Sequence, residues 1–304
     1  MDQICVLMAS YNGEKFIREQ IDSILGQRGV EVRLLVRDDH STDSTVDILR
    51  EYEEAGKLTI LRDDVHLGAA NGFMKLLYTA EPCPYFAFAD QDDLWLPGKL
   101  RRGINAIREL DCPALYCSNQ IIYKNGTDEG LRFRKAPNYT LVNSLCGNSL
   151  SGCTMVFNRA LWEEMRKEGH RPDPDLLNVR MHDVWTLLSA LVLGQVVYDE
   201  GSRIRYRIHE SNTVGIRPTG PAYRIKTLRK RLASRQEQNG RSRIAQELLK
   251  YDIPDPQKKA VVENFAHYRD SLGKKMKLMT DRQVRKDCGE KRPVFLLKTL
   301  LNWI

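Results

Sequence analysis

The sequence predicts an α/β fold in which helices flank a mostly parallel sheet. In residues 1–110, short apolar runs alternate with longer segments whose apolar residues recur every three or four positions. Clusters of Asp, Asn and Ser follow the apolar runs. The 304 residues are 42% hydrophobic, which allows a sizeable core. Repeated strand–helix units of this length indicate parallel strands joined by crossover helices.

Four strands and four helices are expected in this first part. The run ICVLMA is continuously apolar, as in a strand buried on both faces of a sheet. The next segment places Ile17, Ile21 and Ile24 on one stripe of a helix. Pro97 suits the first turn of the fourth helix. The strands are expected at 4–9, 32–36, 57–62 and 84–89, and the helices at 14–27, 42–54, 69–80 and 97–110.

From Pro113 to His209 the pattern is less regular and is typical of α+β structure packed against the first half. The pair Asn125-Gly126 predicts a tight turn at the end of a strand. Strands are expected within 114–130 and at 152–158, 195–199 and 202–209, and helices at 159–167 and 182–194. After Gly215 the chain is predicted to be helical, with breaks at Pro254, Pro256 and Pro293.

The charge is unevenly distributed along the chain. Residues 217–304 carry 22 Lys and Arg against 9 Asp and Glu, a net charge of +13, whereas residues 1–216 carry −6. The chain has no run of about 18 apolar residues, so we expect no membrane-spanning helix. The apolar run at its start is too short for us to expect a signal peptide. The seven cysteines form no CxxC pair, so we expect reduced thiols in a cytosolic protein.

Polar clusters follow each of the first four predicted strands. Ligands of parallel sheets bind beyond the carboxyl ends of the strands, where these clusters would meet. Any one cluster could be an ordinary turn or helix cap, but all four at one edge indicate a binding site. The clusters are Ser10-Tyr11-Asn12, Asp38-Asp39, His66-Leu67-Gly68 with Asn71, and Asp90-Gln91-Asp92-Asp93.

The acidic cluster at residues 90–93 gives the strongest chemical signal. Carboxylates this close raise one another's pKa, so a positive group should lie beside them. Mg²⁺ and Mn²⁺ prefer carboxylate oxygen and bridge it to substrate phosphates. The chain has no GxxxxGK[ST] loop, and no GxGxxG follows its first strand. The pattern therefore predicts a Mn²⁺ or Mg²⁺ ion and a ligand that carries a diphosphate.

Three segments, MASYNGEKFIREQIDSILGQ, VRDDHSTDST and FADQDDLWLPGKL, together resemble glycosyltransferase family 2. SGCTMVFNRAL, MHDVWTLLSALVLG and YRIHESNTVG resemble its bacterial rhamnosyltransferase-like branch, which builds surface polysaccharides. The resemblance covers about residues 3–215. It implies a Rossmann-like GT-A fold and inverting transfer from a nucleotide-sugar. It also implies a nucleotide-sugar-binding half (1–112) and an acceptor-binding and catalytic half (113–215). The charge and helical pattern predict a basic helical extension (216–304), in which no family motif is found.

The resemblance assigns a nucleotide site to the strand ends. Tyr11 would pack on the base, and Asp39 would accept a hydrogen bond from an imide edge that uracil and thymine share. The donor would therefore be a UDP- or dTDP-sugar. His40 stands where the family often has glycine, which alters the turn without removing the base contact. The complete nucleotide-binding set would be Ser10, Tyr11, Asn12, Asp39, Asn71 and Asp90, and Asp90 would face either the ribose or the metal.

The resemblance also assigns the metal and the catalytic base. Asp92, in the DxD motif, and His209 would hold the metal, which stabilises the departing diphosphate. Asp183 would take the proton from the acceptor hydroxyl as its oxygen attacks the anomeric carbon. Gly152 and Trp185 would lie in the acceptor region. Cap, turn or core roles stay open for these residues, and for His182 a packing role competes with one beside the base.

The basic C-terminal extension ends in an apolar stretch that contains Trp303. Basic helices of this kind suit the anionic cytoplasmic face of a membrane, so we expect a cytoplasmic protein that is peripheral on the inner membrane. The acceptor would be a glycan or a lipid-linked glycan. A solvated basic surface is the alternative. Nucleic acid is not an expected partner, because aromatic residues do not interleave with the basic ones.

Two other functions stay open from the sequence. A nucleotidyltransferase would also use a metal and strand–helix units, but it would need a Gly-rich loop with Arg or Lys, which ASYNGEKF matches poorly. A non-catalytic adaptor would bind anionic lipid or nucleic acid through the basic extension. The coherent placement of the carboxylates favours the glycosyltransferase.

Overall fold

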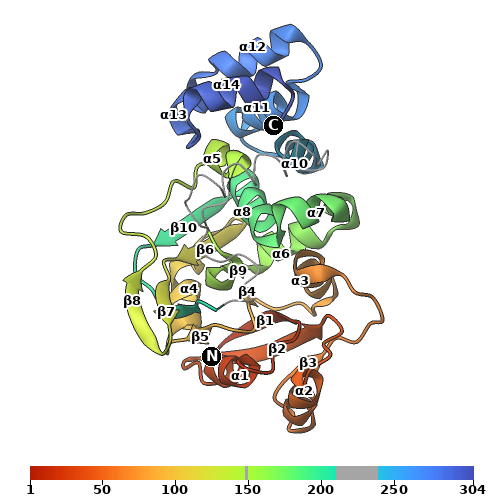
Figure 1. Ribbon diagram of the computed structural model, residues 1–304, viewed down its shortest axis with the longest axis vertical. Coiled ribbons are helices and arrows are strands. Elements are labelled where there is room, and N and C mark those ends of the chain that lie inside the picture. Colours follow the sequence, from red (N-terminus) through yellow and green to blue (C-terminus); the bar gives the residue numbers. More distant parts are fainter. Residues whose placement is uncertain (148–149, 210–238) are drawn as a thin grey trace. The chain divides into compact units, whose positions relative to one another are not determined.

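The computed structural model describes residues 1–147, 150–209 and 239–304 (Figure 1). Contacts divide the chain into two compact units that interleave in sequence. The first unit comprises 1–137, 150–167 and 194–209, and the second comprises 138–149, 168–193 and 210–304. The predicted division by role, at residues 112 and 215, differs from this division by contacts and stays a prediction.

The first unit is built on a seven-stranded sheet of order β10-β6-β9-β4-β1-β2-β3. β1 is parallel to both β2 and β4, β2 is parallel to β3, and β10 is parallel to β6. Only β9 runs antiparallel to its neighbours in this sheet. The predicted, mostly parallel sheet is therefore confirmed. The bounds are β1 Asp2–Ser10, β2 Val30–Asp38, β3 Thr59–Ile60, β4 Tyr85–Ala89, β6 Ala114–Ser118, β9 Val156–Asn158 and β10 Gln195–Asp199.

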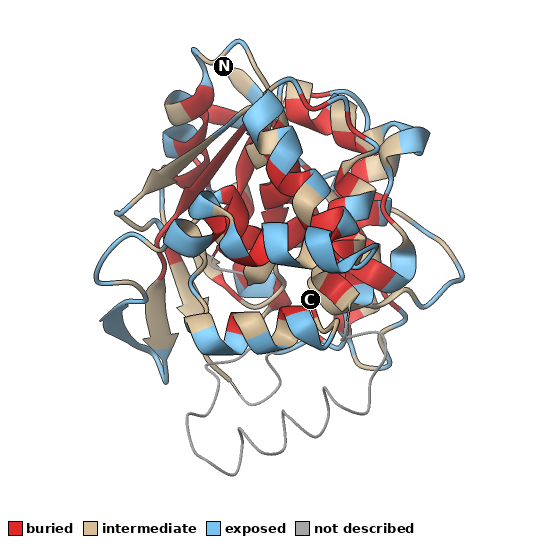
Figure 2. Ribbon diagram, turned by 90° about the horizontal axis from the view of Figure 1, so that it is seen from above, coloured by how far each residue is buried: buried red, intermediate tan, exposed pale blue. Residues whose placement is uncertain are grey.

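Helices cover both faces of this sheet, so alternate side chains of β1 enter different cores. Ile4, Val6 and Met8 belong to one apolar cluster with residues of α1, α2 and α4. On the other face, Phe86 of β4 stacks on Trp162 of α6, with ring centroids 4.8 Å apart. Figure 2 shows buried residues on the strands and exposed residues on the outer sides of helices. The helices are α1 Ile17–Leu25, α2 Thr45–Glu54, α3 Gly68–Thr79, α4 Lys99–Ile107 and α6 Arg159–Arg166.

A second, four-stranded sheet of order β5-β11-β7-β8 lies in the same unit. The Asn125-Gly126 turn between β7 and β8 is confirmed, since both residues have positive φ, 48° and 82°. Several predicted boundaries are too wide, and one of them encloses a different kind of element. β5 forms ahead of Pro97 and α4 begins only at Lys99, and residues 152–154 form a 3-10 turn (η1) rather than a strand. The bounds are β5 Leu94–Trp95, β7 Ile121–Lys124, β8 Thr127–Leu131, β11 Ile204–Arg207 and η1 Gly152–Thr154.

In its described part the second unit is helical. α5 and α7 were not predicted, because each is shorter than two full turns and shows little periodicity. Residues 239–304 form helices α10 to α14, while residues 210–238, which include the first part of the predicted extension, lie outside the described residues. Pro256 and Pro293 lie in the first turns of α11 and α14. The helices are α5 Leu141–Cys146, η2 Glu168–His170, α7 Pro174–Arg180, α8 His182–Leu193, α10 Gly240–Leu248, α11 Pro256–His267, α12 Leu272–Thr280, α13 Arg282–Asp287 and α14 Arg292–Leu300.

Among the residues that the structure describes, no single helix is long and apolar enough to cross a membrane. α7 and α8 together reach the necessary length and composition, but they are bent by 98° at Met181. Most residues of α8 are buried, as expected for a helix in a protein core.

Candidate functional site

The carboxyl ends of β1, β2 and β4 bring Tyr11, Asp39 and Asp90 to one edge of the sheet. Gln91 fixes the loop after β1, because its side-chain amide accepts from Tyr11 N and donates to Tyr11 O, both at 2.9 Å. A Cβ on Gly13 would lie 2.2 Å from Gln91 Oε1, so a larger residue there would displace the Gln91 amide from these two hydrogen bonds. The Tyr11 ring itself is 49% exposed and is available for stacking.

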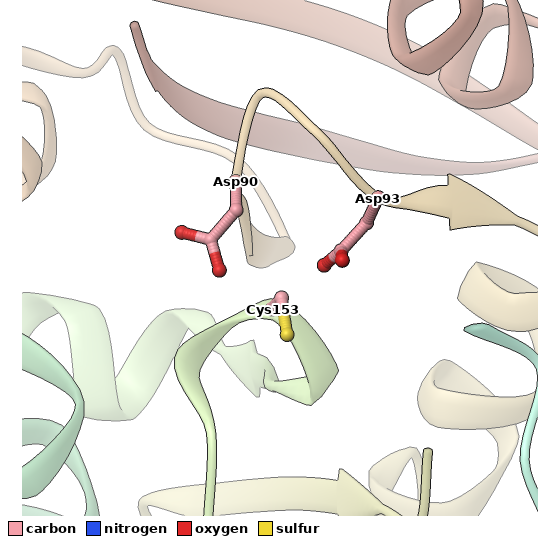
Figure 3. Close-up of side chains that lie close together, drawn as sticks. All are labelled: Asp90, Asp93 and Cys153. Carbon is pink, nitrogen blue, oxygen red and sulfur yellow. The ribbon is translucent and has the colours of Figure 1, made fainter. Parts of the chain in front are cut away.

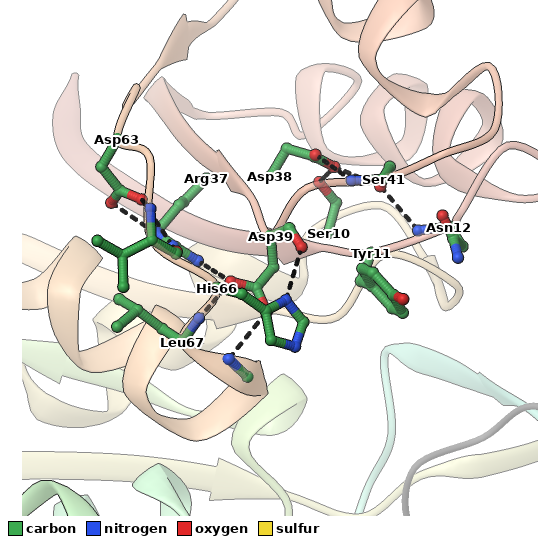
Figure 4. A network of polar contacts seen from close by, with 12 residues as sticks. Ser10, Tyr11, Asn12, Arg37, Asp38, Asp39, Ser41, Asp63, His66 and Leu67 are labelled. Carbon is green, nitrogen blue, oxygen red and sulfur yellow. Dashed lines mark hydrogen bonds and ion pairs between the residues drawn. The ribbon is translucent and has the colours of Figure 1, made fainter.

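Asp39 is buried, and protein donors already surround its carboxylate (Figure 4). Oδ1 accepts from Arg37 Nη1 at 2.6 Å and from Leu67 N at 2.8 Å. Oδ2 accepts from Gly68 N at 2.8 Å and lies 3.1 Å from His66 Nδ1. Burial alone would raise the pKa of Asp39, but the hydrogen bonds from Leu67, Arg37 and Gly68 outweigh it and lower the pKa. Asp39 is therefore a carboxylate that also caps the start of α3.

Arg37 is a functional residue that the sequence did not reveal. Its guanidinium is fully buried and is neutralised by two carboxylates, Asp39 and Asp63. Nε and Nη2 form a bidentate pair with Asp63 at 2.9 and 2.8 Å. The only signal was a basic residue between the apolar run of β2 and its acidic end. Arg37 thus fixes the position of Asp39 from within the sheet.

Ser10 and Asn12 connect the ends of β1 and β2. Ser10 is buried, and its hydroxyl donates to Asp38 Oδ1 at 2.9 Å. Asn12 has φ of 49°, its N donates to Ser41 Oγ, and its Oδ1 accepts from Thr42 N, both at 2.8 Å. These two side chains thus hold the loops in place. Asn71, predicted with them, lies in the first turn of α3.

The structure brings together Asp92 and His209, which are 117 positions apart in the sequence. His209 Nε2 lies 2.8 Å from Asp92 Oδ2, and only 17% and 15% of these side chains are exposed. The His209 ring packs on Phe16, with centroids 4.9 Å apart. Arg207, two residues earlier, donates from Nε to Asp92 O at 2.8 Å and from N to Asp93 Oδ1 at 3.2 Å. The end of β11 is thus fastened to the acidic loop.

Asp90 and Asp93 form a second group with Cys153 of the 3-10 turn (Figure 3). One ligand atom from each of the three lies within 4.8 Å of the others. Asp93 is fully buried, and burial together with the charges of Asp90 and Asp92 raises its pKa well above the usual value. Burial likewise raises the pKa of the Cys153 thiol. This group, like the pair Asp92 and His209, offers ligand atoms for a cation beside the acidic loop.

Lys99 supplies one of the positive charges that the acidic cluster requires. Its ammonium group is buried, and Nζ lies 3.7 Å above the centroid of the Trp95 ring. Burial lowers the pKa of Lys99 to about 8, although the charges of Cys153 and Asp93 oppose that shift. The sequence signal was weak, since Lys99 reads as an ordinary residue at the start of a helix.

Asp183, the predicted base, lies in the first turn of α8 in the second unit and is half-buried. Burial lowers the pKa of its neighbour His182 to about 3, so His182 is neutral and fills a packing position. Gly152 is buried in the 3-10 turn of the first unit. Trp185 is fully buried and stacked on Tyr251, with centroids 5.6 Å apart, which agrees with the core role left open for it. Its place in the acceptor region stays a prediction.

Residues 5–165 match the family model described as "Glycosyl transferase family 2". The chain belongs to glycosyltransferase family 2. This family 2 glycosyltransferase is 31% identical over 217 residues to the dTDP-rhamnosyl transferase RfbG of Shigella flexneri, across 68% of this chain and 73% of the relative. It is 28% identical to the putative teichuronic acid biosynthesis glycosyltransferase TuaG of Bacillus subtilis, across 64% and 74% of the two chains.

Solved structures agree with this glycosyltransferase in fold. The crystal structure of S. aureus TarS 1-349 in complex with UDP matches with a TM-score of 0.60 and 19% identity, across 100% of this chain and 89% of TarS. The mannosyltransferase PcManGT from Pyrobaculum calidifontis, in complex with GDP-Man and Mn²⁺, matches with a TM-score of 0.55 and 14% identity, across 98% and 73%. The predicted family, enzyme class and GT-A fold are therefore confirmed.

Proposed function

We propose that this glycosyltransferase moves a sugar, with inversion, from a UDP- or dTDP-sugar to a glycan or lipid-linked glycan in bacterial surface polysaccharide synthesis. The observation that carries the proposal is the contact of Asp92 with His209 at 2.8 Å, at the edge that also holds Tyr11 and Asp39. Relatives named for dTDP-rhamnosyl transfer and for glucosyl transfer from UDP-Glc to a diphosphoundecaprenol-linked sugar support this class of donor and acceptor.

The base of the donor would lie against the exposed Tyr11 ring and donate its imide N–H to Asp39. Three of the four donors around the Asp39 carboxylate are Arg37 and two backbone N–H groups, which are fixed in place. The fourth, His66, has a side chain that is 63% exposed and can rotate away. Replacement of His66 by the imide would keep Oδ2 of Asp39 fully hydrogen-bonded. His66 would then lie next to the base, either on the same side as Tyr11 or on the other side.

A divalent cation would be held by Asp92 and His209, with Asp90 nearby and the remaining positions left to diphosphate and water. These ligand atoms fit Mn²⁺, which binds both carboxylate oxygen and imidazole nitrogen. If only the carboxylates bound the ion, Mg²⁺ would also fit. When bound, such an ion neutralises charge on the departing diphosphate. Arg207 and Phe16 would keep the His209 ring and the acidic loop in position.

Asp183 would act as the general base on the strength of the MHDVW match. Its carboxylate would accept the proton of the acceptor hydroxyl while that oxygen forms a bond to the anomeric carbon and the bond to the diphosphate breaks. Attack from the side opposite the leaving group inverts the anomeric configuration. The neutral His182 beside it adds no charge that would lower the basicity of Asp183.

Calorimetric titration of UDP and dTDP, with and without Mn²⁺, tests the donor site. We expect binding that requires Mn²⁺, weakens at least about tenfold in Asp92→Asn, and is unchanged in Asp111→Asn, an exposed carboxylate of the same unit. Binding that ignores both Mn²⁺ and Asp92 would contradict the metal assignment. Release of UDP or dTDP from the sugar donor tests the role of Asp183 as the general base. We expect Asp183→Asn to lose this release while it keeps its affinity for the donor. Release of pyrophosphate from UTP or dTTP in the presence of a sugar 1-phosphate would instead indicate nucleotidyl transfer.

A further inference from the structure

The C-terminal helices α12 and α14 expose an unusual number of large apolar side chains. α12 contains Lys274, Lys275 and Lys277, α14 contains Arg292 and Lys298, and neither helix contains an acidic residue. Such apolar side chains are costly on a surface that faces only water. The five cations outnumber the two carboxylates that pair with them, Asp270 with Lys274 and Glu290 with Lys298. The exposed residues, which with these five cations define the α12–α14 surface, are Leu272, Met276, Val294, Leu297, Leu300 and Leu301, with exposures between 40% and 71%.

These apolar side chains are not needed for the core of the second unit, because other residues already fill it. The inner sides of the two helices bury Leu278, Met279, Phe295 and Thr299. Phe295 packs edge-on against Phe265 of α11, with centroids 6.5 Å apart. The exposed residues recur at helical spacing on a different side of each helix, at 272 and 276 and at 294, 297 and 301.

The two helices are fastened to each other, so the surface is preorganised. Lys275 Nζ donates to Leu300 O at 3.3 Å, and the Arg292 guanidinium donates to Met279 O. The chain terminus is tied inward rather than left on the surface. Ile304 is buried, and its backbone O and N bond the Tyr268 hydroxyl at 3.1 and 3.3 Å.

We propose that the α12–α14 surface docks on an anionic lipid bilayer. Apolar side chains would enter the boundary between headgroups and acyl chains, as in amphipathic helices that lie in the membrane plane. The exposed heads of Lys274 and Lys277 would stay at the level of the anionic headgroups, with their aliphatic stems along the apolar residues. Lys275, Arg292 and Lys298 make contacts within the unit and would add positive charge behind them. A nucleic acid would match the charge but leave the leucines without a partner. Trp303, in the apolar stretch that ends the sequence, is half-buried and is not counted in this surface.

Vesicle flotation of the full chain, without substrates, tests this docking independently of sugar transfer. We expect the protein to float with vesicles of phosphatidylglycerol and phosphatidylcholine, but not with phosphatidylcholine alone, and to dissociate as salt rises. Leu297→Ser/Leu301→Ser and Lys274→Glu/Lys277→Glu should each reduce binding about tenfold or more. The matched control Leu131→Ser/Lys124→Glu, on the exposed β7–β8 hairpin of the first unit, should bind like the wild type.

Three results would overturn the proposal. The first is no binding to phosphatidylglycerol vesicles at low salt, as expected if another part of the chain covers the surface. The second is equal binding by the wild type and both α12–α14 variants, since contact would then lie elsewhere. The third is a dimer on size-exclusion chromatography that Leu297→Ser/Leu301→Ser converts to a monomer without change in vesicle binding, because the surface would then join two copies of the chain.

Discussion

Burial of His182 predicts that acid destabilises the protein well before most carboxylates titrate. The buried site lowers the pKa of His182 from 6.5 to about 3. Above pH 6.5 the imidazole is neutral in the folded and the unfolded chain, so it adds nothing to the pH dependence. Below that value the unfolded chain binds a proton that the folded chain cannot. The free energy of unfolding should therefore fall by about 1.4 kcal/mol per pH unit, or about 2 kcal/mol at about pH 5.

Urea unfolding of the wild type and His182→Gln, at about pH 7 and about pH 5, measures this contribution. Glutamine cannot titrate. From about pH 7 to about pH 5, the free energy of unfolding of His182→Gln should therefore fall by about 2 kcal/mol less than that of the wild type. This difference does not depend on how stable the variant is at neutral pH. His267→Gln, at an exposed position of the same unit, controls for the replacement of an imidazole by an amide. Equal losses in the wild type and His182→Gln would refute the reasoning, as would an NMR titration in which the His182 ring protonates near pH 6.5.

Three further predictions follow from single contacts. A Cβ on Gly194 would lie 1.9 Å from Pro113 O, so Gly194→Ala should lower the free energy of unfolding by about 3 kcal/mol, and a loss below about 1 kcal/mol would contradict this clash. Arg37→Gln should cost about 3–5 kcal/mol in urea unfolding, because two carboxylates would lose the buried cation that neutralises them. Cys288 and Cys146 have Sγ atoms 3.4 Å apart, and their hydrogen bond lowers the pKa of Cys288 to about 6. Iodoacetamide at about pH 7 should therefore alkylate Cys288 first, as read by peptide mass spectrometry, and more slowly in Cys146→Ala.

The sequence could predict the first half of the fold because its signals are local. The apolar run of β1 and the helical stripe of Ile17, Ile21 and Ile24 each decide one element without knowledge of the rest. α5 and α7 lack such a signal, because tertiary contacts stabilise them. Arg180 Nη2, at the end of α7, donates to the carbonyls of Ser144 and Leu145 in α5 at 3.0 and 3.1 Å.

The acidic loop could be recognised from its composition, but its partners could not. Asp92 approaches His209 only because β5 and β11 pair, and β5 is a two-residue strand that no pattern predicts. Only the family resemblance suggested that contact. Lys99 and Arg37 were missed for a related reason. A cation is assigned to the surface by default, and burial becomes favourable only when distant residues, here Trp95 and Asp63, come close.

The interleaving of the two units limits how this enzyme can be divided. α8, which carries Asp183, shares its unit with the C-terminal helices, and Tyr251 joins them. Its ring stacks on Trp185, and its hydroxyl shares a 2.9 Å hydrogen bond with Ser189 Oγ. A chimera that exchanged the chain after Gly215 with that of another family member would keep α8 but remove the side chain that covers Trp185. The C-terminal region would therefore have to be inherited together with α8, and the two would change their sequences in concert.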